Sequence, residues 1–198
     1  MKKKYPVKIT PCPIVECKID IFCKFRVPDI VAIGLIYNAL NNLYDGNLEM
    51  SSLPVLNIPE NIRKKDPNLM NQATNSIKCR QDGDIQIGSY GYSFNLRLPY
   101  AGWTVHREFL DKVNEAIHKI DIIENIVNVN RRYLDFFQSR IFEKINLKIN
   151  FVGRTFNAQK SIYKTQLIED DVKHILQITQ GVHIENKELD LKASGSLI

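Results

Sequence analysis

Residues 14–26 carry the pattern that most constrains the fold, because apolar and polar side chains alternate along them with a period of two. The side chains of one parity are apolar, and they are Val15, Cys17, Ile19, Ile21, Cys23 and Phe25. From Glu16 to Arg26, those of the other parity are charged, with Phe22 as the exception. Successive side chains of a β-strand point to opposite faces, so this pattern predicts a strand with one buried face.

Two other segments show apolar residues at helical spacing. Residues 28–44 begin with Pro28-Asp29 and end at Asp45-Gly46, which are start and stop signals for a helix. Residues 104–120 form the second expected helix, with Thr104 as its N-cap.

The remaining elements are expected to be strands and turns. Before the second helix we predict an irregular connection over 46–76 with one short strand at 53–58, then strands at 76–80, 84–88 and 92–98, the first two joined by an Asp82-Gly83 turn. After it we predict strands at 126–137, 142–151 and 187–192, and a hairpin of 161–168 with 173–180. The segment Ala193-Ser194-Gly195-Ser196 is interpreted as a frayed end.

This order of elements predicts an α+β fold. Consecutive strands dominate, so we expect a mainly antiparallel sheet with two principal helices packed on one face. The chain has 198 residues, of which 44% are hydrophobic, and this length and composition predict a single domain with a sizeable core. Within that domain, 1–198, residues 1–13 and 193–198 are expected to be loose ends.

The four cysteines and the lack of a long apolar run bear on the cellular compartment. Cys17 and Cys23 share a strand face but lie about 20 Å apart along an extended strand, so they cannot bridge each other. No Cys-x-x-Cys pair is present, and reduced thiols in a cytoplasmic protein are the expected state. No stretch approaches the length of a membrane span, so we expect no membrane association.

The positive charge is concentrated in one segment. The formal net charge is +5, whereas residues 131–164 alone carry eight basic residues against two acidic ones. The candidate nucleic-acid-binding residues in this segment are Arg131, Arg132, Arg140, Lys144, Lys148 and Arg154. Basic side chains spaced along a sheet can contact phosphates, and nearby aromatic rings can stack on bases. The alternative is a solvated sheet face whose charges prevent edge-to-edge pairing.

Three motifs occur in an order that resembles a known family. They are Pro13-Ile14-Val15-Glu16, the box Pro99-Tyr100-Ala101-Gly102-Trp103, and Arg131-Arg132-Tyr133-Leu134. Over residues 5–136 the chain resembles a sporadically distributed family of uncharacterised bacterial and archaeal proteins with a Pro-Ile-Val-Glu strand and a Tyr-x-Gly-Trp box. It departs from that family in having Asp135 and Phe136 where an Asn is usual, and in stopping near an expected C-terminal helix. The resemblance implies one domain and supplies no catalytic residue.

Tyr100 and Trp103 are the candidate interaction residues. A tryptophan just before a helix can anchor a partner, because aromatic residues dominate interface hot spots. The alternative is that Trp103 pins the helix start to the sheet through its large apolar area.

Catalytic signatures are absent from the sequence. There is no P-loop, no GxGxxG opening a helix and no nucleophile elbow. Asp111, Glu115 and His118 share a helix face that we interpret as solvated, and two Asp-x-Lys matches, at Asp171 and Asp190, lack a partner acid for a metal. We therefore expect no metal ion, no cofactor and no named catalytic residue, although the sequence alone does not decide whether the chain is an enzyme.

Three functions are carried forward in order of preference. The first is a non-enzymatic interaction module or a subunit of a larger assembly, with a protein partner or self-association into a homo-oligomer. The second is a nucleic-acid-binding protein that uses the basic segment 131–164. The third, at a distance, is a metal-dependent nuclease or hydrolase.

Overall fold

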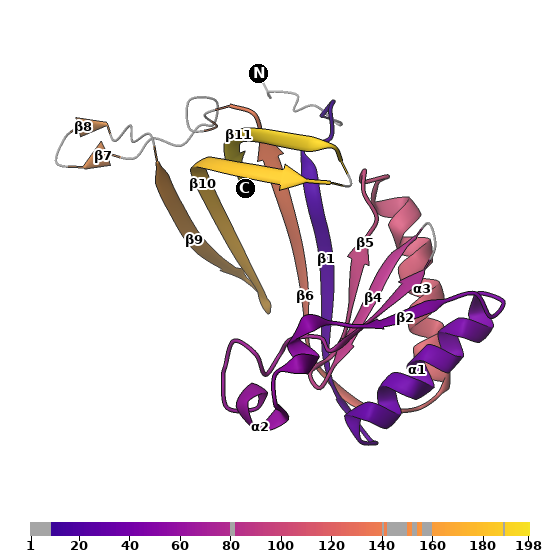
Figure 1. Ribbon diagram of the computed structural model, residues 1–198. Coiled ribbons are helices and arrows are strands. Elements are labelled where there is room, and N and C mark those ends of the chain that lie inside the picture. Colours follow the sequence, from indigo (N-terminus) through magenta and orange to yellow (C-terminus); the bar gives the residue numbers. More distant parts are fainter. Residues whose placement is uncertain are drawn as a thin grey trace. The chain divides into compact units, whose positions relative to one another are not determined.

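The computed structural model describes residues 9–79, 82–139, 141, 150–151, 154–155, 160–187 and 189–198. The strands are β1 (Ile14–Phe25), β2 (Glu49–Ser52), β3 (Asn75–Cys79), β4 (Gly83–Gly88), β5 (Gly91–Leu96), β6 (Ile123–Phe137), β7 (Asn150–Phe151), β8 (Arg154–Thr155), β9 (Ser161–Glu169), β10 (Val172–Asn186) and β11 (Leu191–Leu197). The helices are α1 (Asp29–Leu43), the single turn α2 (Glu60–Arg63) and α3 (Trp103–Lys119), and a 3₁₀ turn, η1, covers Pro54–Asn57. Figure 1 shows these elements along the chain.

The strands confirm an α+β protein built on a large antiparallel sheet. Nine strands are hydrogen-bonded in the order β2-β3-β4-β5-β1-β6-β11-β10-β9, and β7 pairs separately with β8. The chain divides into two compact units. We call Cys17–Arg132 the helical unit, and Met1–Glu16 with Tyr133–Ile198 the strand unit. The prediction of a single domain stays a prediction, and each unit is described by itself below.

The alternating pattern of β1 forms the centre of the helical unit, as predicted. Val15 to Phe25 are buried at every second position, and β1 pairs antiparallel with β5, where Ile19 lies opposite Phe94. Phe94 in turn packs edge-on against Phe109 of α3, with ring centroids 5.7 Å apart. Such ring pairs add to the hydrophobic stabilisation from burial alone.

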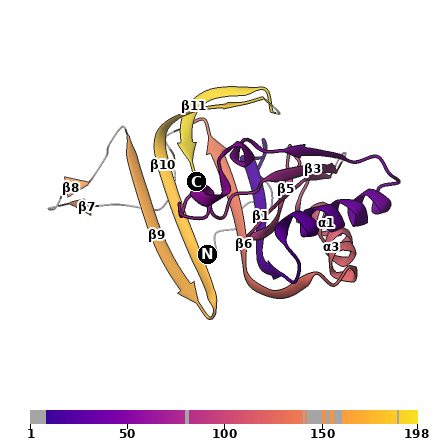
Figure 2. The same ribbon diagram turned by 60° about the horizontal axis from the view of Figure 1, so that its bottom comes forward.

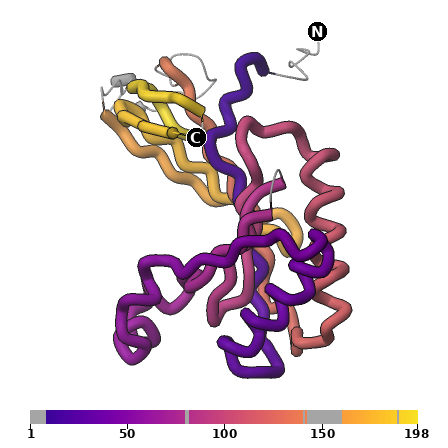
Figure 3. The backbone as a smooth tube through the Cα atoms, turned by 45° about the vertical axis from the view of Figure 1, so that its right-hand side comes forward, coloured from indigo at the N-terminus to yellow at the C-terminus, as the bar shows by residue number. Residues whose placement is uncertain are grey.

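Both long helices take part in this core. The apolar stripe of α1 is buried through Ala32, Ile33, Ile36 and Leu40, and α1 packs against α3 and contacts β4. Figures 1 and 3 show α1 crossing next to α3. The α1 end is set by Asp45 and Gly46, which both have positive φ, and the Gly46 amide donates to the Asn41 carbonyl at 2.7 Å.

The start of α3 differs from the prediction. Thr104 is not the N-cap, because Gly102 occupies that position with a φ of 106° and the helix begins at Trp103. A φ in this range favours glycine, so the chain can turn into the helix two residues earlier than the capping rule for threonine suggested. On the buried side of α3, His106 lies with Phe109, Val113 and Ile117, whereas Val105 is exposed.

The connection between α1 and β3 also differs from the prediction. The short strand expected at 53–58 is wrong, because Pro54 opens the 3₁₀ turn η1 there. Proline has no amide hydrogen and a fixed φ, which suits the first position of a helical turn rather than a ladder. The strand in this region is β2, which precedes the proline and pairs with β3.

In the strand unit, β9 and β10 form the predicted hairpin around Asp170-Asp171, and the turn begins at Asp170 with a φ of 52°. The strand predicted at 142–151 lies mostly outside the described residues, apart from Asn150 and Phe151 in β7. The final strand predicted at 187–192 begins later than expected, because residues 189–190 form a turn and β11 starts at Leu191.

The C-terminal segment is ordered by long-range contacts rather than frayed. Residues 193–197 lie in β11, which pairs with β10 and β6. The Ser196 hydroxyl is fully buried, donates to the Ser139 carbonyl at 2.7 Å and accepts from the Ile141 amide at 3.3 Å. At Gly195 a Cβ atom would overlap the carbonyl oxygen of Phe137, so the small residues allow this close approach.

Substitution of Gly91 tests the packing of β5 against β1 in the helical unit. Gly91 has a φ of 130°, and a Cβ there would overlap the carbonyl oxygen of Ile21 in β1. We expect Gly91→Ala to lower the free energy of unfolding by about 2 kcal/mol or more, because both strain and overlap result. Urea unfolding followed by circular dichroism measures the change.

The matched control for this variant is Gly34→Ala. Gly34 is exposed in α1, with no atom within 4 Å of an added Cβ. Alanine is the better helix former, so this variant should raise the free energy of unfolding by about 0.5–1 kcal/mol. Equal losses from the two substitutions would contradict the β1–β5 contact described above.

Candidate interaction surfaces

Trp103 and Arg131 form one contact on the surface of the helical unit. Trp103 is the first residue of α3 and 41% of its surface is exposed. The guanidinium carbon of Arg131, on β6, lies 5.5 Å from the centroid of the Trp103 ring. This distance is typical of a cation–π interaction, which is worth about 0.5–1 kcal/mol at an exposed site. The structure thus brings together one residue of the predicted aromatic box and one of the predicted basic segment.

Arg131 and Arg132 do not contribute to the same surface. They are consecutive residues of β6, and both are exposed. Neighbouring side chains of a strand point to opposite faces, so only Arg131 lies beside Trp103. The basic segment is therefore split by strand geometry even where its residues are adjacent in sequence.

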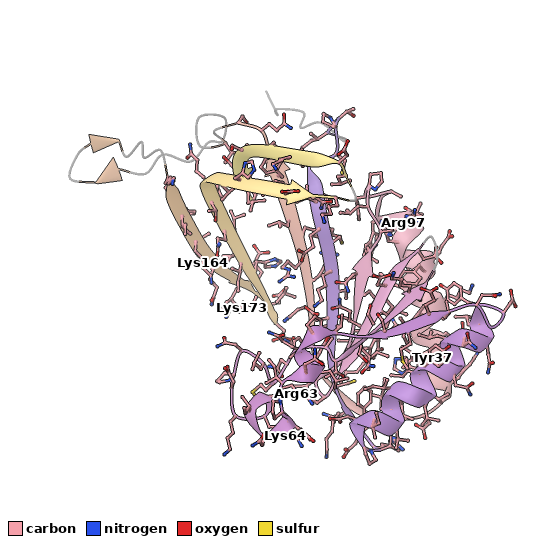
Figure 4. The ribbon with its side chains drawn as sticks, in the orientation of Figure 1. Tyr37, Arg63, Lys64, Arg97, Lys164 and Lys173 are labelled. Atoms are coloured by element: carbon pink, nitrogen blue, oxygen red, sulfur yellow. The ribbon has the colours of Figure 1, made fainter. Side chains whose placement is uncertain are left out.

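The other predicted basic residues do not join this pair within the described chain. Arg140, Lys144 and Lys148 lie outside the described residues, as does the side chain of Arg154, whose backbone belongs to β8. Lys160 and Lys164 are exposed in the strand unit, with Lys164 on β9 (Figure 4). A continuous basic patch over 131–164 stays a prediction.

Tyr100 plays a different part from Trp103. It is half-buried, and its ring lies 4.8 Å from the ring of His106 at an interplanar angle of 31°. His106 is 4% exposed, and its Nε2 atom has no hydrogen-bond partner among the described residues. Burial lowers the pKa of His106, against an opposing effect of Asp82 that raises it, so a neutral imidazole is favoured. Tyr100 therefore packs on the start of α3.

The hairpin formed by β9 and β10 exposes an unusual amount of apolar surface in the strand unit. Its large apolar side chains with exposed fractions between 44% and 72% are Ile162, Leu167, Ile168, Val172, Ile175 and Leu176. Single exposed apolar residues need no explanation, but six on one hairpin, three on each face, are typical of an interaction surface. The sequence predicted this hairpin and gave no sign of its exposure, because apolar residues occur on both of its faces.

The register shows how these residues are distributed. Ile168 lies opposite Lys173 and Ile175 opposite Gln166, so one face carries isoleucines among lysine and glutamine side chains. Leu167 lies opposite His174 on the other face. Lys164 and Lys173, labelled in Figure 4, belong to the isoleucine face. Both faces are thus mixed, as at the surfaces of many reversible interfaces.

An open hollow of about 430 Å³ lies beside β1 in the helical unit. Apolar side chains and Lys24, Asp29, Asn71 and Ser89 line it. Lys24 is paired with Glu124 at 2.8 Å. The Ser89 hydroxyl on this hollow donates to the Met70 carbonyl at 3.2 Å, and burial raises the pKa of the Cys23 thiol, so neither is an activated nucleophile.

Titratable groups elsewhere are dispersed within the described part of the chain. Across those residues, no three His, Cys, Asp or Glu side chains gather as a metal site would require. Asp111 pairs with Arg107 and Glu115 with Lys119 on the exposed face of α3. Burial raises the pKa of Cys23 to about 11 and that of Cys79 to about 12, so both remain thiols at neutral pH and are poor nucleophiles.

Three comparisons with known proteins found no match for the chain. No family model, no curated protein and no solved structure matches it. The resemblance to the family with the Pro-Ile-Val-Glu strand therefore stays a prediction. No described helix is both long and apolar enough to cross a membrane.

We expect the buried carboxylate of Asp135, in β6, to lower the stability of the strand unit. Its Oδ1 atom is buried with no partner among the described residues, and burial raises the pKa of this carboxyl group. A raised folded-state pKa means that the ionised form is disfavoured by folding. Asp135→Asn should therefore raise the free energy of unfolding at pH 7, and the gain should shrink as the pH falls toward 4.

Urea unfolding of both proteins at several pH values measures this difference. Asp190→Asn is the control, because Asp190 is an exposed turn residue whose positive φ asparagine also tolerates. A gain at Asp135 that is the same at every pH would show that desolvation of the charge is not its cause.

Proposed function

We propose that this protein is a non-enzymatic interaction module that binds a protein partner, a second copy included, through the β9–β10 hairpin. The observation that carries the proposal is the set of six large apolar side chains exposed on that hairpin. Burying them against a partner would remove apolar surface from water, at roughly 25 cal/mol for each Å².

Two further features support a binding role over a catalytic one. The Ser89 hydroxyl on the hollow beside β1 donates to a backbone carbonyl, and burial keeps the thiols of Cys23 and Cys79 protonated. The four free cysteines fit the cytoplasmic location that we propose for the module. We also propose that α1 and α3 cover a single face of the sheet, which directs binding to other surfaces.

A photoreactive side chain tests the proposal directly. Benzoylphenylalanine placed at Leu167, on the hairpin, should form a covalent adduct on irradiation in cells that produce the protein. The reason is that an apolar surface of this kind is expected to be in contact with a partner. Mass spectrometry of the adduct identifies the partner as another protein or a second copy.

The matched control places the same group at Asp111, which is exposed on α3. A specific hairpin interaction gives adducts at position 167 and none at position 111. Equal labelling at both positions, or none at either, would rule out the hairpin as the binding surface.

A second candidate function is the binding of single-stranded nucleic acid at the Trp103–Arg131 pair. The observation that favours it is a partly exposed indole ring beside a guanidinium group. Aromatic rings stack on bases of any sequence, and arginine adds phosphate and cation–π contacts. Both residues of this candidate site belong to the helical unit.

Titration of labelled single-stranded RNA and DNA at two salt concentrations tests this candidate. Trp103→Ala and Arg131→Ala should each weaken binding about tenfold, because a stacked base contributes about 1–3 kcal/mol. Arg132→Ala is the control, since Arg132 lies next to Arg131 in sequence and on the opposite face of β6. Equal effects of the two arginine variants would indicate diffuse charge attraction instead of a site.

A further inference from the structure

The outer strand of the hairpin, β9, is an open sheet edge. It pairs with β10 from Ser161 to Glu169, and it is the last strand in the hydrogen-bonded order of the described strands. Figure 2 shows β9 at the outer side of β10. An open edge presents a row of amide and carbonyl groups that can pair with another strand.

Along β9, backbone groups point alternately toward β10 and toward the open edge. Whether a residue has an odd or an even number therefore determines whether it can hydrogen-bond to another strand. Glu169 and Val172 flank the two-residue turn at Asp170-Asp171, and residues in that position are hydrogen-bonded to each other. Hydrogen-bonded and non-hydrogen-bonded pairs alternate along an antiparallel ladder. The backbone groups at the even-numbered positions, from Ile162 to Ile168, therefore point to the open edge.

The side-chain sequence of β9 is complementary to itself in the antiparallel direction. When two copies are placed antiparallel about Thr165, residues whose numbers add to 330 face each other. Within the bounds of β9 the facing pairs are Thr165–Thr165, Lys164–Gln166, Tyr163–Leu167, Ile162–Ile168 and Ser161–Glu169. The large apolar side chains therefore face each other, and both charged side chains of β9 face uncharged polar ones.

The neighbouring registers lack this match. Outward-pointing backbone groups allow only shifts that keep even-numbered residues opposite each other. A shift centred on Lys164 would place the two Lys164 side chains opposite each other and Ile162 opposite Gln166, and one centred on Gln166 would place Ile168 opposite Lys164. Both shifts put an isoleucine against a polar or charged side chain, and the first also brings two like charges together on the axis.

We propose that two copies of this chain associate by antiparallel pairing of their β9 strands about Thr165, which continues the β-sheet of the strand unit across a twofold axis. This inference rests on the proposed interaction function and specifies its partner as a second copy. The exposed apolar residues of β9 then face those of the second copy, as in other isologous interfaces.

Cysteine substitution at the axis tests the register. In the proposed dimer the two Thr165 residues form a non-hydrogen-bonded pair with Cα atoms about 4.5 Å apart, within the range that a disulfide spans. In a Cys12→Ser background, which removes the exposed native thiol, Thr165→Cys should therefore form a covalent dimer under mild oxidation. Non-reducing gel electrophoresis and the intact mass measure it.

Two matched variants on the same strand are the controls. Lys164→Cys and Gln166→Cys should each fail to couple with themselves, because each faces the other residue in the proposed register. An equimolar mixture of these two variants should couple. Coupling of Lys164→Cys or Gln166→Cys alone, without Thr165→Cys, would overturn the register.

A noncovalent measurement separates edge pairing from stacking of hairpin faces. Sedimentation velocity should show that Ile168→Lys raises the dimer dissociation constant at least roughly tenfold, because Ile168 lies at the pairing edge. Ile175→Lys, on the same face but on β10, should raise it by less. The reverse order of effects would indicate face-to-face packing and overturn the proposal.

The two proposals fail in distinguishable ways. A protein that remains monomeric, shows no Thr165→Cys coupling and yields hairpin adducts with another protein would overturn the β9 pairing and leave the interaction function intact. A protein that gives no hairpin adduct and no coupling would overturn both.

Discussion

The alternation of apolar and polar residues along β1 is the constraint on which the helical unit depends. Because its apolar side chains are buried at every second position, the strand has to lie where other elements can cover that side. Phe94 of β5 and Phe109 of α3 extend the same core through an edge-on ring contact. The thiols of Cys17 and Cys23 belong to this core, so we attribute the presence of these two cysteines to packing and not to thiol reactivity.

The sequence predicted the elements whose signals are local. The β1 pattern, the end of α1 at Asp45-Gly46 and the β9–β10 turn are each defined by a few neighbouring residues, and all three occur as expected. The errors concern elements that long-range contacts create. Residues 193–197 contain serine and glycine because β11 has to approach Phe137 closely, and composition alone cannot distinguish this requirement from a flexible end.

The same distinction separates what could and could not be predicted of the candidate surfaces. Trp103 and Arg131 were both identified from sequence, but their contact joins α3 to β6, and only the fold brings these residues together. The separation of Arg131 from Arg132 follows from strand parity and was predictable once β6 was recognised. The exposure of the hairpin could not be predicted. Apolar residues occur on both of its faces, so the sequence pattern does not indicate which face, if either, is buried.

The two edges of the described sheet show why β9 and not β2 is the candidate for pairing. β2 has four residues, and an edge that short offers few hydrogen bonds to another strand. β9 has nine, four of them large and apolar, with no proline and no bulge in its register with β10. Its charged side chains lie at Lys164 and Glu169, where the self-complementary register places them opposite Gln166 and Ser161 rather than opposite like charges. The features that normally prevent edge pairing are therefore sparse on β9, and those it has are compatible with a second copy of itself.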